Sequence, residues 1–379
     1  MAATTTAKST RSIVPMLERL SAIAAPSGNE DRVIAAVVAH AEACGFSPVV
    51  DNIGNVVVPV AEGAAGSPLV FAHLDELGLT VRSIDGDGFV GVERLGGVPE
   101  RVLPGLKMLI HTRAADIPAI VGLKAHHLTP AGEKYVVRPA EELYLDAGFP
   151  SRAAAHEAGI RVGDPITYSP SFTHLAGGLV SGKSFDDRLA VAALLMLLDS
   201  FAESPPDRGV LVAFTVQEEF NVRGSLAIAQ RWRPGIAVQV DVAPACDTPD
   251  LAGRDPVRLG GGPVLTRLSF HGRGTLGGLV PHPALLRALE EAAAAAEVPV
   301  QYQSIVGLIT DAAFLPMATG DGIAAAEVGI PCRYTHSPIE TADPRDAELM
   351  VRLLERFIRA HANIDMRRGR PLAKQGGMS

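Results

Sequence analysis

"GVLVAFTVQEEF", residues 209–220, is an apolar run that ends in two adjacent acids, Glu218 and Glu219. A short continuous apolar run predicts a strand that is buried on both faces. Neighbouring side chains of a strand leave the backbone on opposite faces. The two glutamates are therefore either solvated where the strand reaches water, or they take two different roles at one site.

The sequence on both sides of this run alternates between strand patterns and helix patterns. Strands alternating with helices predict an α/β fold, a mostly parallel sheet with helices on both faces. The predicted helices cover 29–45, 187–204, 223–232 and 282–297, and the predicted strands cover 67–73, 209–217, 235–243, 264–270 and 299–306.

One long segment, 76–172, breaks this alternation. Short β-like pieces such as "LTVRSI" and "AIVGLK" there alternate with glycine and proline. This texture predicts a small β-rich domain inserted into the α/β domain. We therefore expect a catalytic domain made of 1–75 and 173–379, with an insert at 76–172 that serves oligomerisation or substrate access.

Composition excludes several classes of protein. The 379 residues are 47% hydrophobic and 20% charged, which excludes a disordered chain. A net charge of −8 argues against a nucleic-acid surface. The longest apolar stretch, "LAVAALLMLL", is too short to span a bilayer, so no membrane partner is expected.

The expected compartment is the cytoplasm. The three cysteines, Cys44, Cys246 and Cys332, are widely spaced and form no C-x-x-C pair, which suggests a reducing environment. The first residues, "MAATTTAKSTR", lack the apolar centre of a secretory signal.

Polar residues gather where the predicted strands end, which is where α/β sheets bind ligands. Each has an ordinary explanation when taken alone: Asp186 as a helix N-cap, His336 as a surface histidine, Asp241 as a strand cap. Together, two histidines and several carboxylates at one sheet edge would repel or stay unpaired without cations, so they predict a pair of divalent metals. The set is His73, Asp75, Glu218, Glu219, Asp241 and His336, with Asp186 and Asp187 at the start of a helix.

A rival signal is "GRGTLG", 272–277, which fits the dinucleotide pattern G-x-G-x-x-G between a strand and a helix. Pro281 and His282 separate these glycines from the helix, and the next strand ends without the acid that would bind a ribose. A loop is therefore the preferred interpretation. Six other histidines are left unassigned: His126 and His127 because they lie in the insert, and His111, His156, His174 and His271 because they have no acidic partner pattern.

The chain resembles the TET-type metallo-aminopeptidases, a family that also contains proteins labelled glutamyl or deblocking aminopeptidases and endoglucanases. The resemblance covers roughly 12–362 and rests on five ordered motifs: "FAHLDELG", "KSFDDR", "VQEEF", "QVDVAPACDTP" and "RYTHSPIE". It implies a cytoplasmic aminopeptidase that removes N-terminal residues from peptides. It also implies an α/β catalytic domain with a β-rich insert and a homo-oligomeric shell of twelve subunits.

The resemblance also implies the roles of individual residues. His73, Asp186 and Asp241 would bind one metal ion, and Asp186, Glu219 and His336 the other, with Asp186 bridging. Glu218 would be the general base, Asp75 would orient His73, and a non-proline cis peptide is expected at Asp186–Asp187. Histidine and carboxylate ligands suit Zn²⁺ or Co²⁺, and also Mn²⁺.

Some positions depart from the family pattern and keep other functions open. The family usually has glycine near Phe220 and Asn221, and again near Leu308 and Ile309; "DTPDLAGRDP", 247–256, is also altered. These positions flank the ligands, so they bear on substrate choice. The alternatives are a di-metal amidohydrolase for a small metabolite amide and an oligomeric scaffold without metals, which conflicts with the presence of all five ligands.

Overall fold

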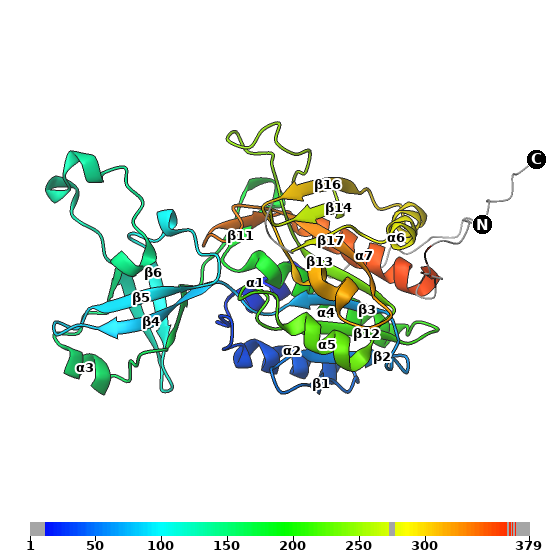
Figure 1. Cartoon of the computed structure of the whole chain (residues 1–379), viewed down its shortest axis with the longest axis horizontal. Coiled ribbons are helices and arrows are strands. Elements are labelled where there is room, and N and C mark those ends of the chain that lie inside the picture. Colours follow the sequence, from blue (N-terminus) through cyan, green and yellow to red (C-terminus); the bar gives the residue numbers. More distant parts are fainter. Residues whose placement is uncertain (1–11, 273–276, 362–363, 365, 367, 369–379) are drawn as a thin grey trace, which may run out of the picture.

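The computed structural model describes residues 12–272, 277–361, 364, 366 and 368. It contains an α/β domain and a β-barrel that lies to one side of it (Figure 1). The helices are α1 (Val14–Ser21), α2 (Asp31–Ala43), α3 (Arg152–Glu157), α4 (Phe185–Glu203), α5 (Gly224–Trp232), α6 (Pro283–Ala295) and α7 (Pro344–His361).

A 12-stranded sheet forms the centre of the α/β domain, and nine of its strands run in the order β1-β2-β12-β3-β13-β17-β18-β11-β10. The other three, β14, β15 and β16, join this path where β14 pairs with β17. The bounds are β1 (Val49–Val50), β2 (Val56–Val60), β3 (Leu69–His73), β10 (Phe172–His174), β11 (Val180–Gly182), β12 (Val210–Thr215), β13 (Ile236–Pro244), β14 (Val264–Phe270), β15 (Gly278–Leu279), β16 (Gln301–Val306), β17 (Ala324–Arg333) and β18 (Glu340–Ala342).

The sheet is mixed, so the prediction of a mostly parallel sheet is wrong in this respect. The four central strands β12, β3, β13 and β17 run parallel to one another. The strands outside them pair antiparallel, for example β1 with β2 and β17 with β18. Short connections can join only antiparallel strands, because a parallel pair needs a crossover.

Helices cover both faces of the sheet, as predicted, and the apolar residues of the strands alternate between the two faces. Val70 and Ala72 of β3 belong to a core cluster with α1, α2, α4, α6 and α7. Leu69 and Phe71 of the same strand belong to a second cluster, with α5 and the 3₁₀ helix η6 (Asp311–Met317). Burial on both faces explains why the central strands read as continuous apolar runs.

The inserted barrel closes on itself in the order β4-β5-β8-β7-β6-β9. Its side chains form a separate apolar core, which includes Leu79, Val92 and Ile166. Closure leaves the barrel without an unpaired edge strand. Its strands are β4 (Gly78–Ile84), β5 (Val90–Leu95), β6 (Lys107–His111), β7 (Asp116–Val121), β8 (Tyr144–Asp146) and β9 (Pro165–Tyr168). The domain limits at 75/76 and 172/173 stay a prediction.

One charged contact joins the barrel to α2. The guanidinium of Arg32 donates two hydrogen bonds of 2.8 Å to the carboxylate of Asp116. The same carboxylate lies 2.8 Å from Nδ1 of His111, so the expectation that His111 has no acidic partner is wrong. Hydrogen bonding from Arg32, followed by that from His111, lowers the pKa of Asp116 to about 2. Asp116 therefore stays charged and can link the two domains.

The glycine pattern and the length of the apolar helices can also be compared with the structure. The glycine pattern at 272–277 lies mostly outside the described residues, which omit 273–276. Among the helices that are described, none combines the length and the apolar character that a bilayer crossing requires.

Candidate metal centre

Glu218 and Glu219 lie in a turn beyond the end of β12. β12 ends at Thr215, which pairs with His73 at the end of β3, and the predicted strand to 217 is therefore two residues too long. Gln217 then takes a φ of 57°, in the left-handed region. Because this turn ends the alternation of the strand, Glu218 and Glu219 can both approach His73.

Asp75 holds these glutamates in place. Its two carboxylate oxygens accept hydrogen bonds from the backbone nitrogens of Glu218 at 2.9 Å and Glu219 at 3.1 Å. Ser27 donates a third bond, of 2.6 Å. Burial opposes ionisation of Asp75, but the contact with His73 lowers its pKa below the usual value. The charged carboxylate therefore fixes the backbone that carries both glutamates.

His73 presents one ring nitrogen to the centre. Its Nδ1 donates to the backbone carbonyl of Asp75 at 3.1 Å and lies 3.5 Å from the Asp75 carboxylate. A carbonyl only accepts, so this bond directs Nε2 the other way. Nε2 lies 3.0 Å from Oδ1 of Asp186. Asp75 therefore contacts His73, and its orienting role stays a prediction.

Asp186 contacts two histidines. Its Oδ2 lies 3.5 Å from Nε2 of His336, whereas Oδ1 faces His73. The backbone at Asp186 is not helical, with φ −80° and ψ 103°, and the expected cis peptide joins it to Asp187. These contacts favour a site role for Asp186 over the N-cap interpretation.

His336 is held by residues from both domains. Its Nδ1 donates to the carbonyl of Gly97 at 3.1 Å, and the Tyr168 hydroxyl donates to the carbonyl of His336 at 3.3 Å. Its Nε2 lies 3.8 Å from Oε1 of Glu219. The side chain is 39% exposed, but its ring is aimed at buried carboxylates, which argues against an ordinary surface histidine. Gly97 and Tyr168 belong to the insert, so the insert helps to position the centre.

Asp241 lies inside β13 and not at its end, so the strand-cap interpretation is wrong. Gln239 donates to its Oδ2 at 2.8 Å, and the backbone nitrogen of Val242 donates to its Oδ1 at 2.7 Å. One ligand atom each of His73, Asp187 and Asp241 lie within 4.8 Å of one another. A second such group joins His73, Asp186 and Glu219.

Asp187 and Glu340 also contribute contacts to the centre; Asp187 was among the candidates without a role of its own, and Glu340 was not among them. Asp187 accepts a bond from the His73 backbone nitrogen at 3.3 Å. Glu340 accepts bonds from the backbone nitrogens of Asp186 at 3.0 Å and His336 at 2.6 Å. Both residues lie inside the quoted motifs, but a contact with a backbone nitrogen leaves no pattern in residue types.

Three residues at the centre have left-handed backbones: Ser184 with φ 58°, Gln217 with φ 57° and His336 with φ 70°. Each such conformation costs about 1–3 kcal/mol in a residue other than glycine and persists only where surrounding contacts hold it. The Gln217 nitrogen, for example, donates to the buried carboxyl of Glu30 at 3.1 Å. Left-handed residues of this kind often occur at functional sites, and these three lie beside the candidate ligands.

The electrostatics of the centre favour the binding of cations. Burial raises the pKa values of several carboxyls well above normal, and repulsion between neighbouring acids adds to this effect: Asp187, Glu218, Glu219, Asp241 and Glu340. For His73, burial opposes the charged form, but hydrogen bonding to Asp186 and Asp75 raises its pKa well above normal. Acids forced together in this way are stabilised by bound positive charge.

The donor atoms fit divalent metals. Oδ1 of Asp187 and Oε1 of Glu219 are buried and make no hydrogen bond to any described residue. A buried carboxylate oxygen without a partner is costly, and a metal ion would satisfy it. A small cavity lies among Asp186, Glu219 and His336. Imidazole nitrogens and carboxylate oxygens suit Zn²⁺, Co²⁺ or Mn²⁺.

Comparison with known proteins agrees with this geometry. Residues 54–353 match the protein family described as M42 glutamyl aminopeptidase. The chain belongs to this family. It is therefore a hydrolase that acts on peptide bonds, and the resemblance to TET-type aminopeptidases is confirmed.

Individual relatives cover most of the chain. SgcX of Escherichia coli is 38% identical over 307 residues, which are 80% of this chain and 82% of SgcX. An aminopeptidase from the archaeon Desulfurococcus kamchatkensis is 32% identical, with a TM-score of 0.85, over 92% of this chain and 95% of its own. The TET1 peptidase of Pyrococcus horikoshii, which can assemble into a tetrahedron or a large octahedral shell, is 28% identical with a TM-score of 0.81, over 92% and 99%.

One departure from the M42 pattern has a structural counterpart. After the glutamate pair, Asn221 has φ 69° and Val222 has φ 48°. This region of φ favours glycine, and a β-branched residue is rare there. The backbone therefore keeps a glycine-like conformation although the glycine itself is replaced. Phe220 is 38% exposed, and the guanidinium of Arg223 lies 4.8 Å from the centre of its ring.

Proposed function

We propose that this M42 protein is a di-metal aminopeptidase that removes N-terminal residues from peptides. His73, Asp186 and Asp241 would bind one divalent ion, and Asp186, Glu219 and His336 the second. The observation that carries the proposal is the contact of the two Asp186 oxygens with different histidines, at 3.0 Å and 3.5 Å. A carboxylate placed in this way suits a bridging ligand.

The proposed mechanism divides the work between the adjacent glutamates. Two divalent ions, when bound, supply a water of lowered pKa, about 7, and polarise the scissile carbonyl. Glu218 accepts a proton from the attacking water and returns it to the leaving amine, which contributes roughly 10²–10⁴-fold. Glu219 serves as a ligand. Because Asp75 binds both backbone nitrogens, it keeps the two carboxyls in these separate roles.

A substrate panel tests the activity. Purified protein loaded with Zn²⁺ or Co²⁺, and in parallel with Mn²⁺, should release the anilide from aminoacyl anilides. It should not cleave the same anilides after N-acetylation. Activity on acylated metabolite amides without activity on aminoacyl anilides would establish the amidohydrolase instead. If the protein binds two ions per chain and cleaves neither class of substrate, both proposed activities are excluded.

Asp75→Asn should lower kcat/KM and metal affinity by roughly 10–100-fold. The carboxylate accepts bonds from Glu218, Glu219 and Ser27, and an amide has only one acceptor oxygen for these donors. Steady-state kinetics and metal titration measure the effect.

Ser27→Ala is the matched control for Asp75→Asn, because it removes one donor and leaves both carboxylate oxygens on the glutamate backbone. Its loss of activity should be clearly smaller. Equal losses in the two variants would show that Asp75 does not act by holding the glutamates.

We propose further that the protein forms a homo-oligomer, most simply of twelve subunits, through the insert at 76–172. Support comes from TET relatives, since one solved structure is a dodecamer. The segment between β7 and β8 extends away from the barrel (Figure 1). It carries exposed apolar side chains. Leu128 is 79% exposed and Tyr135 94% exposed, and such side chains mark an interaction surface.

Light scattering should therefore report a large assembly for the full chain, and the double variant Leu128→Lys/Tyr135→Lys should dissociate it. Two charges at a desolvated contact cannot be accommodated without partners. Val280→Lys, at a 76% exposed apolar residue outside the insert, is the matched control and should leave the assembly intact. A monomeric parent protein at micromolar concentration would contradict the proposal.

A cytoplasmic location is part of the same proposal. The three cysteines form no disulfide with one another. Thiols of this kind are expected in a reducing compartment. Cell fractionation tests the assignment, and recovery of the protein outside the cytoplasm would refute it.

A further inference from the structure

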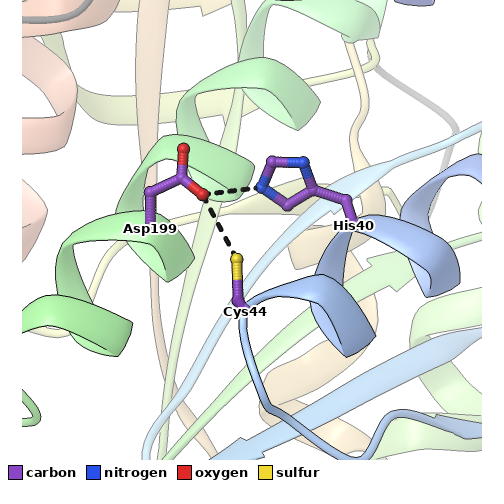
Figure 2. A group of neighbouring side chains, drawn as sticks. All are labelled: His40, Cys44 and Asp199. Atoms are coloured by element: carbon purple, nitrogen blue, oxygen red, sulfur yellow. Dashed lines mark hydrogen bonds and ion pairs between the residues drawn. The ribbon is translucent and has the colours of Figure 1, made fainter.

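A second cluster of potential metal ligands lies on the two helices α2 and α4. His40 is in the last turn of α2, Cys44 directly follows that helix, and Asp199 belongs to α4 (Figure 2). Nε2 of His40 lies 2.9 Å from Oδ1 of Asp199, and the Cys44 thiol donates to the same oxygen at 3.2 Å. One ligand atom of each residue lies within 4.8 Å of the others.

The local sequence explains this convergence. Residues i and i+4 of a helix lie on one face, so His40 and Cys44 point the same way. That face of α2 includes the buried residues Val37 and Ala41 and packs against α4. The cluster is separate from the metal centre, because Asp199 lies about 20 Å along α4 from Asp186 at 1.5 Å per residue.

We propose that His40, Cys44 and Asp199 form a binding site for Zn²⁺. An imidazole nitrogen, a thiolate and a carboxylate oxygen are ligands that Zn²⁺ accepts together, whereas Mg²⁺ and Ca²⁺ prefer oxygen alone. Three protein ligands leave a fourth tetrahedral position for water. All three residues are partly exposed, so an ion and a water can reach them.

The distances fit such an ion. With Zn–ligand bonds of about 2.0–2.3 Å, a tetrahedral site separates nitrogen from oxygen by about 3.4 Å and sulfur from oxygen by about 3.6 Å. The present distances are 2.9 Å and 3.2 Å, so each must lengthen by only about 0.5 Å or less. Small side-chain rotations on two packed helices can supply this change. The ion would replace the hydrogen bonds and join the end of α2 to α4.

The competing explanation is a hydrogen-bonded cluster that holds α2 against α4 without an ion. Binding of Co²⁺ distinguishes the metal site from the hydrogen-bonded cluster, because a thiolate bound to Co²⁺ gives a charge-transfer absorption in the near ultraviolet. The ligands proposed for the metal centre are nitrogen and oxygen only. The absorption therefore reports on a cysteine site, whatever the metal centre binds.

The experiment is a Co²⁺ titration of the metal-free full chain under reducing conditions, followed by Zn²⁺. The wild-type protein should develop the thiolate absorption, and Zn²⁺ should remove it. Cys44→Ser should lack the absorption and keep its peptidase activity. Cys246→Ser, at a buried cysteine elsewhere in the chain, is the matched control and should retain the absorption. His40→Gln and Asp199→Asn should weaken the Co²⁺ affinity of this site, measured from the thiolate absorption, by more than about tenfold.

Several results would overturn the proposal. A wild-type protein without the absorption at saturating Co²⁺ would leave only the hydrogen-bonded cluster. An unchanged absorption in Cys44→Ser would assign it to another cysteine. Unchanged affinity in both His40→Gln and Asp199→Asn would reduce the site to a thiol that binds cobalt by itself.

Discussion

Glu218→Gln should keep both metal ions and bind substrate, while kcat falls by roughly 10²–10⁴-fold. Glutamine preserves the size of the side chain but cannot accept a proton from water. The backbone bond between Glu218 and Asp75 does not involve the altered group, so the turn should keep its shape. Metal analysis and steady-state kinetics on the purified variant measure both parts of the result.

Glu219→Gln is the matched control, because it makes the same chemical change one residue away. Oε1 of Glu219 is buried, makes no hydrogen bond within the described chain, and lies 3.8 Å from Nε2 of His336. Loss of this anionic oxygen should weaken one ion, and added metal should restore part of the rate. Metal loss in Glu218→Gln with full occupancy in Glu219→Gln would reverse the two roles. Wild-type metal content and kcat in both variants would show that neither glutamate acts as base or ligand.

Asp186→Ala should abolish activity and release both ions. Asp186 is the residue whose carboxylate faces both His73 and His336, so its removal takes an anionic ligand from each proposed ion. The remaining carboxyls would then be buried together without their cations, which favours their protonated forms. Metal content per chain and turnover of aminoacyl anilides measure the outcome.

Asp187→Asn tests whether the neighbouring acid has been assigned wrongly. Asp187 groups with His73 and Asp241, and its Oδ1 is buried without a hydrogen bond to the described residues. If Asp186 is the bridge, Asp187→Asn should keep more metal than Asp186→Ala. Two ions per chain in Asp186→Ala, with loss in Asp187→Asn, would move the bridge to Asp187.

Local patterns in the sequence predicted the elements better than their arrangement. The apolar runs that became β3, β12 and β13 were predictable because both faces of these strands are buried. The antiparallel pairing of β18 with β17 and of β14 with β17 was not. Pairing direction depends on connections between distant segments, and a periodic pattern of side chains is the same for either direction.

The site could be predicted in part. Residue types placed His73 and Asp186 among the candidates at one sheet edge, and the family motifs supplied their proposed roles, which stay predictions. The supporting contacts could not be read in the same way. Gly97, for example, acts through its backbone carbonyl, which every residue type has.

The sequence by itself therefore determined the class of fold, the presence of an insert and the family, because apolar periodicity and ordered motifs are properties of the linear chain. Only the tertiary structure decided how the adjacent glutamates share one site. The turn at Gln217 and the two bonds from Asp75 set their directions. It alone also brought Asp199 to His40 and Cys44, because that contact joins residues more than 150 positions apart and depends on how α2 packs on α4.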